Sequence, residues 1–334
     1  MKDLYARLCR FEPADWERAL EAIAPHILHI DRNATRIWFA FWPLDLSLAL
    51  ASSDDPQALS RKLGLMGRWR LSEQIDESHR FLYAHRYWPQ VKNAIASDRE
   101  WPTELPAIVE AVADAAARIT RTDREMLLGM AAVGLMTLRQ TGVEVFASAP
   151  GTVHLSPAAI RLSPHQVLRR RAKRDRQALF GFVRGPARRW RVTFDESEPH
   201  ATFPVIQGQE IATAAQTDKR DYRSRDPRCT PGEGPIPVEC RAASCGTCWV
   251  GVLAGAERLS PVVDRDERTR MKVFGYSVAD EPTPLIRLAC QARAQGSVSI
   301  VIPPWNGMFG GKLGAVRTES EATAVGPPGP PVRE

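Results

Sequence analysis

Four cysteines in the second half of the chain constrain its structure more than any other feature of the sequence. Cys240, Cys245 and Cys248 form the pattern C-x4-C-x2-C within "CRAASCGTC", and Cys290 follows in "IRLACQAR". Three closely spaced cysteines with a remote fourth are the pattern in which thiolates hold the two irons of a [2Fe–2S] cluster. Apart from Arg241, the residues between the first three cysteines are small, so backbone N–H groups can approach the sulfur atoms. The sequence therefore predicts a [2Fe–2S] cluster bound by these four thiolates.

Structural zinc is the main alternative for the same cysteines. Zinc usually takes its thiolates from two separated C-x2-C pairs, whereas this chain has one such pair and two single cysteines. A disulfide framework is not favoured, because six cysteines are spread over 334 residues and the N-terminal stretch lacks the apolar run of an export signal. The sequence favours the cluster and leaves zinc or an unmetallated core open.

The segment from about residue 188 to residue 304 resembles the [2Fe–2S] ferredoxins of plant type and their bacterial relatives on this cysteine motif. The resemblance implies a β-grasp fold, in which a mixed sheet packs on a helix and the cluster loop lies at one edge. It implies that Cys240 and Cys245 bind the iron nearer the surface, while Cys248 and Cys290 bind the inner one. It also implies one-electron transfer, at a reduction potential as low as about −400 mV.

Three features depart from the family pattern. Ala243 stands where the family commonly has glycine, so the backbone there must suit a residue with a Cβ atom. The segment 217–237 is longer than the usual link between helix and cluster loop, and it contains Cys229. We interpret Cys229 as a loop cysteine without a role, with a spare ligand or a redox-sensitive thiol as alternatives. The second half also lacks the strong acidity of many relatives, so a partner that recognises an acidic face is not assured.

The pattern of apolar residues changes near residue 186 and predicts an α+β chain of two domains. Helical periodicity begins at Pro13, with Trp16, Leu20, Ile23 and Ile27 on one face, and continues over about 72–97, 104–119 and 122–140. Strand signals follow in "RWRVTFDE", "ATFPVIQ", "CWVGVLAG" and "GSVSIVIPP", with a short helix at "QEIATAAQ". We expect a mainly helical domain at 1–186, a ferredoxin-like β-grasp domain at 187–304 and a flexible tail at 305–334.

The helical half shows no family motif. His26 and His29 are three residues apart but have no matching second pair, so we interpret them as helix-face or core residues and Cys9 as a buried thiol. "DESHRFLYAHRYW" supplies Asp76, Glu77, His79 and His85, which fall short of the paired ligands of a di-iron bundle. The aromatic stretch at Trp38, Phe39, Phe41 and Trp42 is typical of a core, with a pocket wall as the alternative.

Charge and the missing motifs limit the functional classes. The formal net charge is +6. The basic run 169–177 is interpreted as a solvated helix face, with docking to an acidic protein surface as the alternative and nucleic acid or anionic lipid last. The longest apolar run, 126–136, is too short to cross a bilayer, so we expect a cytoplasmic protein without an integral membrane segment. No phosphate-binding or dinucleotide-binding motif is present, so the chain needs a redox partner to supply its electrons.

Two main hypotheses for function follow. In the first, the chain is an electron carrier or a subunit of a redox complex, and its helical half docks it between a donor and an acceptor protein. In the second, it is an enzyme whose helical half holds a further cofactor or substrate and receives electrons from the cluster. An iron–sulfur sensor that binds nucleic acid is a weaker third. The sequence favours the first, because only the cluster has a complete set of ligands.

Overall fold

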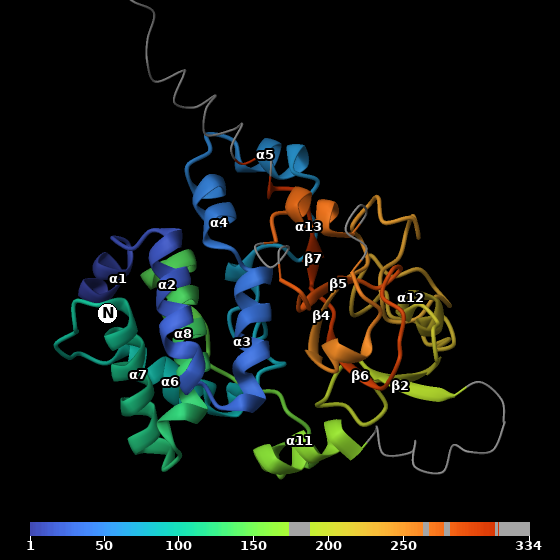
Figure 1. Cartoon of the computed structure of the whole chain (residues 1–334). Helices are drawn as coiled ribbons and strands as arrows, with labels where there is room; N and C mark the ends of the chain where they lie inside the picture. Colours follow the sequence, from blue (N-terminus) through green and yellow to red (C-terminus); the bar gives the residue numbers. More distant parts are fainter. Residues whose placement is uncertain (174–187, 263–266, 277–280, 311–312, 314–334) are drawn as a thin grey trace, which may run out of the picture.

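The chain folds into a helical half followed by a mixed β-sheet, as Figure 1 shows. This computed structural model describes residues 1–173, 188–262, 267–276, 281–310 and 313. Helices account for nearly all regular structure before residue 174, and all strands but one short one come after residue 188. The predicted α+β character, with helices first and a mixed sheet after them, is confirmed at this level.

The helical half is built around one buried helix, α8 (Arg124–Thr141), in which every residue from Leu127 to Leu138 is buried. A helix that is apolar on all sides must lie inside the protein, and here it packs against α3, α6 and α7. The other helices of this half are α1 (Lys2–Leu8), α2 (Pro13–Ile23), α3 (His29–Phe41), α4 (Leu44–Ala51), α5 (Pro56–Lys62), α6 (Trp88–Ala96), α7 (Leu105–Thr120), α9 (Val143–Ser148), α10 (Pro157–Ile160) and α11 (Pro164–Lys173).

The predicted helices at 104–119 and 122–140 correspond to α7 and α8, and the one at Pro13 corresponds to α2. The prediction of a helix over 72–97 is wrong in its first part, where turns and the short 3-10 helices η2 (Leu71–Glu73) and η3 (Tyr83–Tyr87) lead into α6. The buried carboxylate of Asp31 explains part of the difference. It accepts hydrogen bonds from the backbone N–H groups of Tyr83 (2.6 Å) and Ala84 (2.8 Å), which a continuous helix would have used internally.

The second half contains a five-stranded sheet in the order β3-β2-β6-β4-β5. Its strands are β2 (Arg189–Thr193), β3 (Thr202–Ile206), β4 (Trp249–Ala254), β5 (Ile286–Leu288) and β6 (Val298–Val301). β2 pairs with β6 in parallel, and the other three pairings are antiparallel. The predicted strands and the β2–β3 hairpin are confirmed, as is the short helix, α12 (Ile211–Ala215), which contacts β3. The remaining helices are η5 (Ala256–Arg258) and α13 (Thr269–Phe274).

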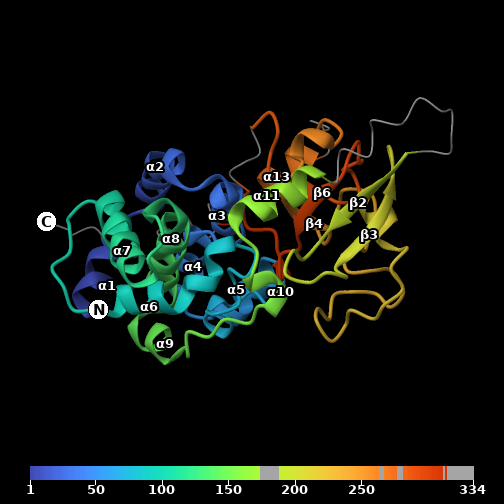
Figure 2. The same ribbon diagram turned by 90° about the horizontal axis from the view of Figure 1, so that it is seen from below.

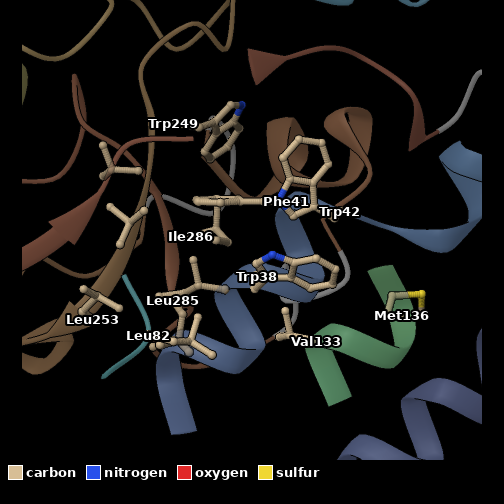
Figure 3. Close-up of a cluster of buried hydrophobic side chains, with 14 of the residues drawn as sticks. Trp38, Phe41, Trp42, Leu82, Val133, Met136, Trp249, Leu253, Leu285 and Ile286 are labelled. Atoms are coloured by element: carbon tan, nitrogen blue, oxygen red, sulfur yellow. The ribbon is translucent and has the colours of Figure 1, made fainter. Parts of the chain in front are cut away.

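Helix α3 joins the two halves by packing directly on β4 (Figures 1 and 2). Trp38, Phe41 and Trp42 of the aromatic stretch are buried here, as predicted for core residues. Figure 3 shows them beside Trp249 and Ile286 of the sheet. Buried side chains of both halves form one connected hydrophobic cluster. The aromatic stretch therefore belongs to a core that the helical and sheet regions share.

Residues 305–310 depart from the tail that we predicted to start at residue 305. Strand β7 (Trp305–Asn306) pairs antiparallel with β1 (Met66–Gly67) of the helical half. Trp305 and Phe309 are buried, and the rings of Trp305 and Trp42 lie 6.1 Å apart between centroids. These large aromatic side chains stabilise the segment despite its glycines. The rest of the expected tail, apart from residue 313, lies outside the described residues.

Candidate functional site

The structure brings the four predicted cysteines together at one end of β4 and β5. Cys240 and Cys245 lie in the loop before β4, Cys248 directly precedes that strand, and Cys290 lies just after β5. The thiols meet in two hydrogen-bonded pairs, Cys245 with Cys240 and Cys248 with Cys290. The second pair is buried, whereas Cys240 and Cys245 are only half-buried. The arrangement thus has an outer pair and an inner pair of sulfur atoms.

Backbone N–H groups surround the sulfur of Cys240. Ala242, Ser244 and Cys245 donate hydrogen bonds to Cys240 Sγ at 3.4, 3.4 and 3.3 Å. Partial burial opposes ionisation of this thiol, but the hydrogen bonds outweigh it and lower the pKa of Cys240 to about 6. The loop therefore stabilises the thiolate of Cys240, and the thiolate is the form of cysteine that binds metal.

The two thiols of the inner pair differ in acidity because Cys248 donates a hydrogen bond to Cys290. The hydrogen bond from Cys248 lowers the pKa of Cys290 to about 6, against the effect of burial. Donation to Cys290, together with burial, raises the pKa of Cys248 above its usual range. The side-chain amide of Gln291 lies 3.5 Å from Cys290 Sγ, and Thr247 Oγ1 lies 3.2 Å from Cys245 Sγ. Each pair thus has further donors directed at a sulfur atom.

The loop reaches this shape through left-handed backbone conformations. Arg241, Ala243 and Gly246 have φ angles of 53°, 55° and 66°. Ala243 adopts the conformation that glycine favours, at a cost of about 1 kcal/mol for its Cβ atom, and its N–H donates to Cys290. A Cβ atom at Gly246 would lie 2.0 Å from the ring of Phe274, so only glycine fits there. Ala243 thus adopts the left-handed conformation at the cost of local strain.

The four thiols have the chemistry that a two-iron cluster requires. They form two pairs of sulfur donors, and N–H groups are directed at their sulfur atoms. Within the described part of the chain, no three side chains of His, Cys, Asp or Glu are grouped to hold a metal ion together. A [2Fe–2S] cluster takes two protein donors at each iron, and the four thiols here form two such pairs.

Cys229 does not join the four cysteines. It is buried, its thiol donates to the carbonyl of Pro235 at 3.4 Å, and burial raises its pKa to about 12. Cys9 is half-buried at the end of α1. The segment around Cys229 is organised by three Asp-x-Arg turns, in which Asp218, Asp221 and Asp226 each bind the arginine two residues later. The repeated Asp-x-Arg pattern is visible in the sequence "TDKRDYRSRDPR", although we based no prediction on it.

The histidines of the helical half do not form a metal site with the acids near them. His79 and His85 are buried, and their Nδ1 atoms lie 2.9 Å apart. Asp76 instead accepts hydrogen bonds from Trp88 Nε1 (2.8 Å) and the backbone N–H of Gly151 (2.8 Å). His26 and His29 are exposed at the end of η1 (Ala24–His26) and the start of α3. Neither histidine pair therefore adds ligands to the cysteine site.

The basic run is only partly a solvated face. Arg169 and Arg170 on α11 are exposed, but Arg171 turns inward and binds Glu196, which follows β2, at 2.7 Å. It also donates to the carbonyl of Ile30 in α3. Arg171 thus links the two halves. Residues 174–177 of the run lie outside the described residues.

Sequence reasoning missed a cavity of about 420 Å³ at the junction of the two halves. Its walls come from residues 68–86, α10 and α11 on one side, and from residues 194–197, 222–229 and β6 on the other. No motif marks it, because its lining comes from segments that lie far apart in the sequence. Among the described helices, none is both long and apolar enough to cross a membrane.

The four thiols and the mixed sheet define the second half as an iron–sulfur protein domain. The profile of the 2Fe-2S iron-sulfur cluster binding domain family matches residues 231–295, a span that contains all four cysteines. A plant-type ferredoxin of Pseudomonas putida is 32% identical over 105 residues, which are 31% of this chain and 80% of that protein. The chain therefore belongs to the plant-type [2Fe–2S] ferredoxin family through its C-terminal part. No solved structure matches it significantly.

Proposed function

We propose that this protein is an electron carrier or a redox-complex subunit that passes single electrons through a [2Fe–2S] cluster held by Cys240, Cys245, Cys248 and Cys290. The observation that carries the proposal is the meeting of these four thiols in two pairs from separate segments of the chain. When bound, the cluster supplies a site that accepts and releases one electron without proton or group transfer. This assignment also agrees with the family to which the second half belongs.

Each pair of cysteines has its own role in the proposal. Cys240 and Cys245 hold the outer iron beneath a loop whose Arg241, Ala242 and Ser244 are exposed, so a partner protein can approach there. Cys248 and Cys290 hold the inner iron, and their burial keeps water away from it. The N–H groups around Cys240 Sγ stabilise the negative charge that the cluster gains on reduction.

Residues 187–304 form a β-grasp domain in this proposal, and residues 1–186 form a helical domain. The mixed sheet with β2 and β6 adjacent and parallel, and α12 against β3, supports the assignment. The helical domain docks the carrier to its partner, with Arg169 and Arg170 of α11 as exposed cations for an acidic surface. Arg171 has no part in docking, because it is held by Glu196.

The enzyme hypothesis remains the second candidate, and the cavity at the junction of the halves favours it. Analysis of the purified full-length protein for iron, acid-labile sulfide, zinc, haem and flavin separates the two. Two irons and two sulfides per chain with no other cofactor support the carrier. Haem, flavin or iron beyond two per chain supports the enzyme instead, and zinc in place of iron contradicts both.

A further inference from the structure

We propose that the cavity at the junction of the two halves is a binding site for a small organic anion that carries an apolar group. Its volume of about 420 Å³ lies in the range of small-molecule sites. One wall is the segment 222–229, which lies in the insertion that distinguishes this chain from simple ferredoxins, and the opposite wall belongs to the helical half. The site thus needs both of the features that a small electron carrier lacks.

The charges in the walls leave a positive excess for the ligand. All four lining carboxylates are paired with arginines: Glu77 with Arg80 (3.3 Å), Glu196 with Arg171 (2.7 Å), Asp226 with Arg228 (2.6 Å) and Asp195 with Arg225. Arg68 also lines the cavity, is exposed and has no carboxylate partner within the described ranges. Because the acids of the walls are already neutralised, Arg68 is available to an anionic group.

The backbone holds Arg68 at the edge of the cavity. Its N–H donates to the carbonyl of Pro304 at 2.9 Å, and its own carbonyl accepts from the side chain of Gln74. A second lining cation, Arg86, donates to the main-chain carbonyls of Ile160 and Leu162, both at 2.9 Å, and among the described residues no carboxylate is hydrogen-bonded to it. A fixed backbone next to an uncompensated cation is the arrangement that orients an anionic ligand.

The rest of the lining is suited to an apolar body. Phe81, Leu162, Phe194, Leu253 and Ile300 face the cavity from both halves. The phenol of Tyr83 is already hydrogen-bonded to the carbonyl of Leu162 at 2.7 Å, and that of Tyr222 to Asp218 at 2.6 Å. These two phenols are satisfied within the protein, so the cavity offers a cluster of apolar side chains together with polar walls and a charged edge at Arg68. This combination favours an acid with an aromatic or branched aliphatic group over a cation.

Two fluorescent dyes test the proposal in the full-length protein with its cluster bound. The first is 1-anilinonaphthalene-8-sulfonate, an aromatic anion, and the second is N-phenyl-1-naphthylamine, which lacks the sulfonate. We expect one saturable site for the anionic dye per chain. Arg68→Gln weakens that dye about tenfold and changes the neutral dye by no more than about twofold. Arg70→Gln, an exposed arginine outside the cavity, is the matched control and leaves both dyes unchanged.

A second pair of variants tests the location. Ser224 is exposed and lines the cavity, so Ser224→Trp places an indole in its mouth without altering the core and weakens both dyes at least about tenfold. Ser52→Trp, on the end of α4, leaves binding unchanged. Cluster absorption verifies folding in every variant. The proposal is overturned if no saturable site is found, if Ser224→Trp binds like the parent, or if Arg68→Gln weakens the two dyes equally.

Discussion

The backbone of Gly251 in β4 lies so close to Ile37 in α3 that a Cβ atom at Gly251 would stand 2.5 Å from Ile37 Cγ2. Such a distance is shorter than any contact that carbon atoms tolerate, so the helical half rests directly on the strand that follows the cluster loop. Phe41 Cζ lies 3.1 Å from the same position. At this contact the two halves therefore pack as tightly as the interior of one domain.

We predict that Gly251→Ala destabilises the full-length protein by about 1–3 kcal/mol, because the added methyl group forces α3 away from the sheet. Denaturant unfolding measures the effect. Ile37→Ala removes the opposing side chain, so the double variant should lose less stability than the sum of the two single changes. Additive losses would mean that α3 and β4 are not in contact in solution.

Replacing any one of Cys240, Cys245, Cys248 and Cys290 by Ala is predicted to abolish or strongly destabilise the cluster, because each is one of the four ligands that we propose. Visible absorption and iron content measure the loss. Cys229→Ala and Cys9→Ala are the controls and should retain the absorption, since neither thiol contacts the site. Loss of colour in Cys229→Ala alone would overturn the ligand assignment.

Much of this arrangement could be predicted from the sequence, because the signals were local. The spacing of Cys240 to Cys248, the alternation in β2 and β3 and the apolar run of α8 each depend on residues close in the chain. Cys290 could be grouped with the others because a remote fourth cysteine completes the plant-type pattern.

The contacts between distant segments could not be predicted. Gly251 has no local sign that a helix will rest on it, and Arg171 looks like its solvated neighbours until Glu196 is brought beside it. Trp305 was assigned to a tail because its neighbours are glycines and prolines, although its ring packs on Trp42. Tertiary packing decided each of these cases.

Stability should depend on pH through the two buried histidines. Burial lowers the pKa of His79 well below its usual value and lowers the pKa of His85 to about 4. The unfolded chain binds protons at these residues near pH 6.5, where the native state does not, so stability falls as pH drops from about 6.5 to about 4. For His85 alone the loss reaches about 3 kcal/mol.

Comparison with His85→Asn isolates this contribution to the pH profile. Burial raises the pKa of Asp31 to about 6, so the native state holds that proton longer than the unfolded chain and gains stability as pH falls toward 4. The parent and the His85→Asn variant share the effect of Asp31. The difference between their free energies of unfolding at each pH therefore reports the contribution of His85. A difference that stays constant between pH 7 and pH 4 would contradict the prediction.

Because we propose that α11 docks the carrier to its partner, we expect the double change Arg169→Glu with Arg170→Glu to slow electron transfer with the native partner about tenfold at low ionic strength. The same change should flatten the dependence of the transfer rate on salt. Stopped-flow kinetics measure both. The absorption and the reduction potential of the cluster should not change. Arg169 and Arg170 are far from the four cysteines in the sequence and lie on a different element. Arg10→Glu with Arg61→Glu, also exposed, is a control of equal charge. Equal rates in the two double variants would assign Arg169 and Arg170 to a merely solvated face.

We propose that the four cysteines together hold one [2Fe–2S] cluster that carries one electron. Anaerobic reductive titration of the purified full-length protein tests this assignment, with iron and acid-labile sulfide determined on the same sample. We expect one electron to bleach the visible absorption of a chain with two irons and two sulfides. Uptake of two or more electrons per chain, or a protein that contains zinc and takes up none, would contradict it.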